Sequence, residues 1–216
     1  DIESAKTLAE YMIEIGKYFN RKVVCVLTDM NTPLGFSVGN SLEVKEAQEF
    51  FSGIREKRLE DLVISLASEM VSIGKDISIE DAKALVIDTL NNGSAKDKFY
   101  EWITNQGGKL GKMKSSKYTK IIYSDKDGYI NNIDPIGIAK FVQSLGAGRV
   151  KKEDSINLNV GITLKSTLYT KVTKGTPLLE VFYDKVIDNM EDEILKCFTI
   201  ESIKKEEKDI IIDVIK

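Results

Sequence analysis

The sequence contains no histidine among its 216 residues. This absence excludes Ser-His-Asp and Cys-His catalytic systems and most zinc sites, because each of them depends on an imidazole. Any general acid or base in this chain must therefore be a carboxylate, a lysine, a tyrosine or a cysteine.

Cysteine, long apolar runs and clustered charge are scarce too. Cys25 and Cys197 are the two cysteines, both in apolar surroundings, which favours a reducing, cytoplasmic compartment. No apolar run approaches the ~20 residues that span a bilayer, and the first residues lack a signal-peptide pattern, so we expect no membrane partner. The 31 basic and 34 acidic residues are interspersed. We expect no nucleic-acid partner, because that requires clustered positive charge.

The residues that are present, 42% of them apolar and 30% charged, are typical of a soluble globular protein. The chain begins at Asp1, without an initiator methionine, and leads directly into a helical pattern. We therefore expect it to be part of a longer protein.

The first half, residues 1–108, has the pattern of an α/β domain with a buried strand and several helices. Residues 4–17 predict an amphipathic helix whose apolar positions are Ala5, Leu8, Ala9, Met12, Ile13 and Gly16. The continuously apolar run 23–27 predicts a strand buried on both faces of a parallel sheet. Four helices are expected between residues 41 and 106, the first opened by a capping box of Asn40 and Glu43. Because the partners of the strand are expected upstream, we predict an intermolecular contact or local disorder at its edge.

The second half has a different character. Residues 109–116 are a basic connector with Gly and Ser, and residues 117–216 predict an α+β domain with a twisted antiparallel, barrel-sandwich-like sheet. The expected strands lie near 118–123, 129–130, 160–164, 177–181 and 210–212, with helices near 135–145 and 184–197.

A loop of thirteen residues, Thr28 to Asn40, follows the apolar strand. Asp29 and Met30 come just after the carboxyl end of that strand, where open α/β sheets place their ligands. The alternative is a surface loop in which Asp29 makes an Asx-turn. Glu46, in the next helix, could add a carboxylate to loop carbonyls, and hard cations prefer such oxygen ligands. A solvated glutamate on a helix explains the same spacing.

Two other motifs favour structural roles. Lys174-Gly175-Thr176-Pro177-Leu178 resembles the hairpins of biotinyl and lipoyl carriers, but the Met113-Lys114 pair lies in the connector and not at a hairpin tip. A second stretch with two glycines and three cations is Leu145-Gly146-Ala147-Gly148-Arg149-Val150-Lys151-Lys152-Glu153-Asp154. Its glycines follow a helix instead of opening one. That order favours a helix C-cap over a phosphate-binding turn.

Three longer stretches resemble one enzyme family. They are VLTDMNTPLGFSVGNSLEVKEA, LGAGRVKKEDSINLNVGI and VTKGTPLLEV. In order and spacing they are similar to the C-terminal portion of the pyrimidine-nucleoside phosphorylase and thymidine phosphorylase family. The resemblance implies a parent enzyme, usually a homodimer, that converts a pyrimidine nucleoside and phosphate into the free base and a pentose 1-phosphate. It implies catalysis by positioning and by charge stabilisation of an oxocarbenium-like centre.

The departures from the family pattern matter as much as the match. The family's phosphate loop has a Lys-His-Ser-Thr-Gly-Gly signature, and this chain contains no histidine. The Arg, Ser and Lys that hold the nucleobase belong upstream of the matched region. We therefore predict no catalytic and no substrate-binding residue in this chain, and no activity of the chain alone. A stand-alone, non-catalytic binding or carrier module is the alternative.

The resemblance carries one site over in part. Some relatives bind a structural monovalent or calcium-like cation beside the phosphate loop. Its ligands here would be the backbone carbonyls of Leu34 and Ser37 and the carboxylate of Glu46, while no cofactor is required for the chemistry. The resemblance makes the loop the back wall of a phosphorylase site, with Asp29 and Met30 as supports. Because only part of the ligand set is present, we expect no tight cation binding by the isolated chain.

Overall fold

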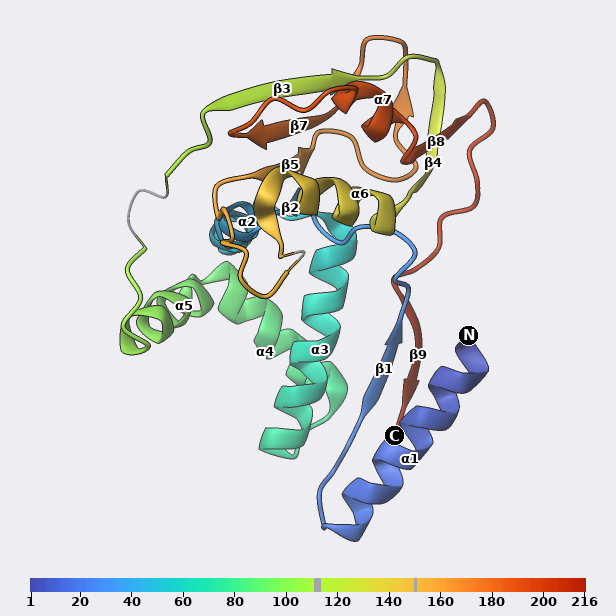
Figure 1. Ribbon diagram of the computed structural model, residues 1–216. Helices are drawn as coiled ribbons and strands as arrows, with labels where there is room; N and C mark the ends of the chain where they lie inside the picture. Colours follow the sequence, from blue (N-terminus) through green and yellow to red (C-terminus); the bar gives the residue numbers. More distant parts are fainter. Residues whose placement is uncertain (111–113, 150) are drawn as a thin grey trace. The chain divides into compact units, whose positions relative to one another are not determined.

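The computed structural model describes residues 1–110, 114–149 and 151–216. Its contacts divide the chain into two compact units (Figure 1). Unit 1 comprises residues 1–29, 56–98 and 208–216, and unit 2 comprises residues 30–55 and 99–207. The boundaries of these contact units differ from the predicted domain boundaries, which were 1–108, 109–116 and 117–216. The predicted domains stay a prediction.

Unit 1 is a two-stranded antiparallel sheet with helices. Strand β1 (Cys25–Thr28) pairs with β9 (Ile211–Ile215), with a register shift between Leu27 and Thr28. The helices are α1 (Ile2–Tyr18), α3 (Lys57–Lys75) and α4 (Ile79–Asn91). Figure 1 shows β1 and β9 side by side along α1. The sequence prediction of a helix over 4–17 is confirmed.

The expected parallel sheet is wrong for the strands that the structure describes. The partner of β1 is β9, which runs antiparallel to it, and Leu27 is the one buried residue of β1. Part of the apolar run faces α1 instead of a second sheet face, since a Cβ on Gly16 would lie 2.4 Å from Cγ2 of Val23. A continuous apolar run does not by itself distinguish these arrangements.

Local sequence explains where several helices begin. In α4, the Ser78 hydroxyl accepts a hydrogen bond from the backbone N–H of Asp81. Helix α2 (Asn40–Phe51) differs, because its N-cap is Gly39 and not Asn40. The Glu43 carboxylate accepts the Gly39 N–H at 3.0 Å, while the Asn40 side chain donates to the carbonyl of Ala147. The capping box is thus half present. Helix α5 (Ser94–Asn105) is the fourth predicted helix.

Unit 2 contains two antiparallel sheets. The first has the order β2-β5-β7-β3, from Ser37–Val38, Gly161–Leu164, Pro177–Tyr183 and Tyr118–Tyr123. The second has the order β6-β4-β8, from Lys171–Val172, Gly128–Ile133 and Phe198–Glu201. Both sheets contribute to one apolar core, together with α6 (Pro135–Val142) and α7 (Met190–Leu195). The α+β character is confirmed, and within the described residues the sheets form no closed barrel.

Two details of unit 2 differ from the sequence prediction. The helix expected over 184–197 is shorter, because Asn189 adopts a left-handed conformation with φ of 55° and α7 begins only after it. The helix expected over 135–145 is α6 followed by a π-helical turn, Gln143–Ala147, in which Gly146 has φ of 102°. The glycines there end a helix, in agreement with the sequence. Met113 of the connector and Val150 lie outside the described residues.

Candidate functional site

The loop after β1 is divided between the two units, at the bond between Asp29 and Met30. Its first residues belong to unit 1. The Asp29 backbone N–H donates to the carbonyl of Ile210 at 2.8 Å, and the Asp29 carboxylate forms a 3.0 Å ion pair with Arg58. Both side chains of the pair are more than four-fifths buried. Asp29 therefore ties the end of β1 to the segment before β9 and to the first turn of α3.

Met30, the next residue, is 80% exposed. An exposed thioether next to a paired carboxylate supplies neither an acid nor a base. The contacts of Asp29 are structural, and Met30 is exposed to solvent. The role of these two residues as supports of a catalytic site stays a prediction.

The rest of the loop is organised around the buried carboxylate of Glu46, on α2. Its Oε1 accepts the backbone N–H of Phe36 at 2.5 Å, and its Oε2 accepts that of Ser37 at 2.9 Å. Glu46 is 7% exposed and Ser37 is 8% exposed, whereas Leu34 is 37% exposed. A solvated helix glutamate is thus the wrong description, since this side chain is buried and fixes the loop.

Gly35 permits this approach of the loop to the carboxylate. It has φ of 78°, and a Cβ there would lie 2.6 Å from Oε1 of Glu46. The left-handed backbone conformation and the lack of space for a Cβ together require a glycine at position 35. The sequence signal was present in the Pro-Leu-Gly-Phe run of the loop, although the residue that Gly35 faces was not predictable from it.

The three residues predicted as cation ligands, Leu34, Ser37 and Glu46, all lie in unit 2, and the Ser37 amide contacts the Glu46 carboxylate. Carboxylate and carbonyl oxygens are the ligands that a hard cation prefers, and Glu46 contributes a buried carboxylate here. Each Glu46 carboxylate oxygen accepts a backbone N–H of the loop, from Phe36 and from Ser37. Within the described residues no group of three or more His, Cys, Asp or Glu forms a metal cluster, so backbone carbonyls would have to complete the shell.

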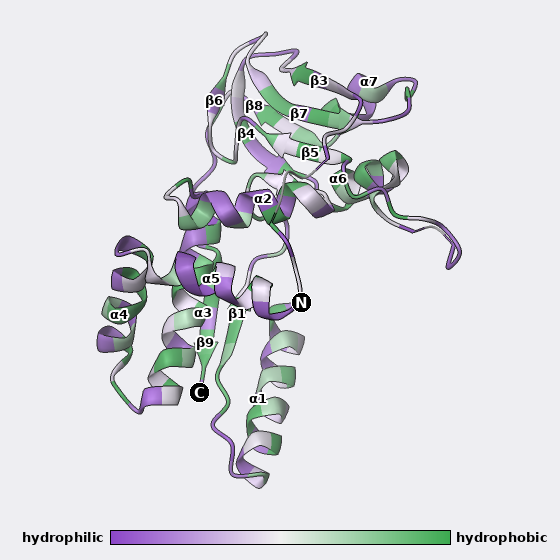
Figure 2. Ribbon diagram, turned by 90° about the vertical axis from the view of Figure 1, so that its left-hand side faces the viewer, coloured by the Kyte–Doolittle hydropathy of each residue, from purple (hydrophilic) through white to green (hydrophobic). Residues whose placement is uncertain are grey.

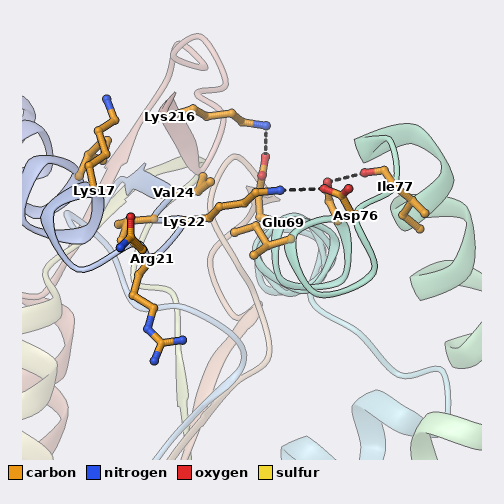
Figure 3. Close-up of a pocket in the computed structure, with 13 residues that line it drawn as sticks. Lys17, Arg21, Lys22, Val24, Glu69, Asp76, Ile77 and Lys216 are labelled. Carbon is orange, nitrogen blue, oxygen red and sulfur yellow. Dashed lines mark hydrogen bonds and ion pairs between the residues drawn. The ribbon is translucent and has the colours of Figure 1, made fainter.

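A pocket lies within unit 1, between α1, α3 and the segment that precedes β1. Its volume is about 600 Å³ (Figure 3). Its charged side chains form the pairs Lys22–Asp76 at 2.7 Å and Lys216–Glu69 at 2.9 Å. The guanidinium of Arg21 extends away from these pairs (Figure 3). Most of these side chains are exposed, and the arrangement offers no nucleophile next to a base. We do not regard it as an active site.

The titratable groups with altered pKa values in unit 2 are structural as well. The side chain of Asn157 and the backbone N–H of Lys117 lower the pKa of Asp184. Burial, and then the charge of Asp134, raise the pKa of the Cys197 thiol. A buried thiol that stays protonated is a poor nucleophile.

No described helix is long and apolar enough to cross a membrane.

Comparison with known proteins identifies the chain's relatives. Residues 129–201 match the family model described as the pyrimidine nucleoside phosphorylase C-terminal domain. The pyrimidine-nucleoside phosphorylase of Bacillus subtilis (strain 168) is 36% identical over 205 residues, which are 91% of this chain and 46% of that protein. The chain is a relative of the pyrimidine-nucleoside phosphorylases.

Other phosphorylases of this group agree. That of Staphylococcus epidermidis (strain ATCC 12228 / FDA PCI 1200) is 37% identical over 211 residues, or 93% of this chain and 48% of that protein. That of Staphylococcus aureus (strain USA300) is 38% identical over 189 residues, or 83% and 43%. The chain spans about half the length of the curated phosphorylases it matches. The family resemblance found in the sequence is confirmed.

Proposed function

We propose that this chain forms the C-terminal portion of a pyrimidine-nucleoside phosphorylase. The reaction of the parent enzyme is the reversible conversion of a pyrimidine nucleoside and phosphate into the free base and a pentose 1-phosphate, a pentosyl transfer. The observation that carries the proposal is 36–37% identity to phosphorylases over 91–93% of the chain. The parent is proposed to act in nucleoside metabolism in the cytoplasm, as a homodimer.

The role of this portion is support of a site whose reactive groups lie outside the chain. The end of the loop is fastened to α2 by the Glu46 carboxylate, which accepts the amides of Phe36 and Ser37. Phosphorolysis depends on positioning of the two substrates. A rigid loop at the wall of the site would contribute to that positioning without contacting the reacting atoms.

The alternative of a stand-alone carrier module is less well supported. A carrier presents its modified lysine at a tight hairpin tip, whereas Lys114 lies outside the strands. Lys174 is in a turn, but its backbone N–H donates to the Asp127 carboxylate and its turn joins strands of the core. The relatives found are phosphorylases over most of the chain.

A steady-state assay tests the proposal. The purified chain is incubated with phosphate and uridine or thymidine, and release of the free base is measured. In parallel, this chain replaces the matching half of the Bacillus subtilis phosphorylase in a single chimeric polypeptide. We expect no turnover from the chain alone and phosphorolysis by the chimera. Turnover by the chain alone would refute the assignment of the reactive groups, and a folded but inactive chimera would refute the proposed function.

We propose further that the carbonyls of Leu34 and Ser37 and the Glu46 carboxylate contribute to a structural cation site of the complete enzyme. A bound monovalent or calcium-like cation would supply positive charge that fixes the loop. The burial of Glu46 and the oxygen-only character of the donors support this role. The melting temperature of the chimera should rise with added K⁺ or Ca²⁺, and Glu46→Gln should abolish the rise. An equal rise in both proteins would refute the site.

A further inference from the structure

Helix α1 has three distinct faces and not two. A buried face of Ala9, Ile13 and Gly16 lies toward the sheet of unit 1. A polar face is formed at helical spacing by Glu3, Thr7, Glu10, Glu14 and Lys17. The third face, which we name the apolar stripe, comprises Leu8, Tyr11, Met12, Ile15, Tyr18 and, just beyond the helix, Phe19.

The apolar stripe is open to solvent in this chain. Exposed fractions range from 51% for Met12 to 82% for Tyr18, and four residues of the stripe are between 59% and 67% exposed. Figure 2 shows apolar residues recurring along the length of α1. Single exposed apolar residues are common, but a contiguous stripe marks an interaction surface. A helix that is apolar over more than one face is usually buried on more than one side.

Rotation of α1 cannot hide the stripe, because the helix is fixed on unit 1. Lys6 forms a 3.1 Å ion pair with Asp213 of β9. Gly16 lies so close to Val23 that a Cβ would contact Cγ2 at 2.4 Å. Turning the stripe inward would separate both contacts and would bury the polar face. The stripe therefore stays exposed in the arrangement that the structure describes.

We propose that the apolar stripe of α1 is the docking surface for the half of a phosphorylase that this chain does not match. The inference rests on the proposed function. The matched phosphorylases contain roughly as much polypeptide again, since the chain spans 46–48% of their length. The sheet next to α1 has only two strands within the described residues, β1 and β9, and isolated two-stranded sheets are marginally stable. Further polypeptide would cover the helix and extend the same sheet.

A second copy of this chain fits the stripe less well. The polar face that borders the stripe contains the carboxylates of Glu3, Glu10 and Glu14, with Lys17 as its one basic residue. Pairing two copies through α1 would bring these acidic borders together, and like charges across an interface oppose association. Self-association is therefore an outcome that would contradict the proposal.

Thiol labelling tests the docking surface. Ile15→Cys places a thiol in the centre of the stripe, and Glu10→Cys places a matched thiol on the polar face of the same helix. Both variants carry Cys25→Ala, and Cys197 contributes little background because it is 7% exposed and its pKa is raised by burial. Labelling rates are compared between this chain and the chimera with the Bacillus subtilis phosphorylase. We expect the thiol at position 15 to react at least 10-fold more slowly in the chimera and the thiol at position 10 to react equally in both.

Each other result overturns the inference. Equal labelling at position 15 in a folded chimera shows that nothing covers the stripe. Protection at position 15 that rises with the concentration of this chain alone shows that a second copy is the partner. If the chimera does not fold, the two halves are co-expressed as separate chains with a tag on this one, and failure to co-purify also overturns it. Phosphorolysis by the chimera is recorded separately, so that an inactive but protected chimera contradicts the proposed function and leaves the docking surface standing.

Discussion

Replacement of Glu46 by glutamine should loosen the loop of residues 34–38. The carboxylate accepts the amides of Phe36 and Ser37 through different oxygens, and a glutamine side chain has one oxygen and one donating NH₂ group. One buried amide therefore loses its acceptor, which costs about 2 kcal/mol within a typical range of about 1–3 kcal/mol. If the loop opens locally, the exchange of that amide with deuterium should accelerate about 30-fold.

The assay is amide hydrogen exchange resolved at residues 34–38, combined with urea denaturation. Glu49→Gln is the matched control, because Glu49 lies on the same helix in an exposed ion pair with Lys45 at 3.5 Å. The control should change the free energy of unfolding by less than about 0.5 kcal/mol and leave loop exchange unaltered. Unchanged exchange in Glu46→Gln, or equal effects of both variants, would refute the reasoning that the carboxylate organises the loop.

Three further outcomes are expected. Because Asn157 lowers the pKa of Asp184, ionised Asp184 stabilises the fold above its ordinary pKa of 3.8, and this contribution is lost as the pH falls below that value. Asp184→Asn should therefore be less stable than wild type at pH 7 in urea denaturation, with a gap that closes below pH 3.8; a constant gap would contradict this. Gly35→Ala should destabilise more than Gly53→Ala, because both have positive φ but only at Gly35 would the Cβ meet Glu46; equal melting temperatures would exclude the clash. Calorimetry of the chain alone with K⁺ or Ca²⁺ should detect no micromolar affinity, and such affinity would show that the ligand set is complete.

Residue type and spacing predicted helices and strands well where neighbouring residues in the sequence determine them. The helix expected over 4–17 and the strand expected over 118–123 are both present in the structure. The partner of the apolar strand did not follow, because the pairing of Cys25 with Ile215 joins residues from opposite ends of the chain. Periodicity reports which face of an element is apolar, but it does not report what covers that face.

Helix α1 illustrates the same limit. Leu8 and Met12 were assigned to the buried face together with Ala9 and Ile13, yet they are 60% and 51% exposed. Their spacing suits either face of a broad apolar arc. Only the close approach at Gly16 fixes which part of the arc meets the sheet.

For the candidate site, composition and family resemblance were more informative than spacing. The absence of histidine excluded whole classes of chemistry. The spacing between the loop and Glu46 favoured a solvated side chain over a cation ligand. The structure decided that Glu46 is buried, through contacts with the amides of residues 36 and 37 that no periodicity encodes. The ligand roles of Leu34, Ser37 and Glu46 stay a proposal.

The pairing of β1 with β9 has a consequence for synthesis of the protein. The ribosome must add the whole of unit 2 between Cys25 and Ile215 before the two strands can meet. At typical translation rates this interval is about 10–40 s. During that time the apolar strand β1 lacks the partner that it has in the structure and is available to other nascent chains. Pairing of β1 with β9 is therefore a late event in synthesis, and its yield in a cell should depend on chaperones that hold the segment around β1 until β9 is available.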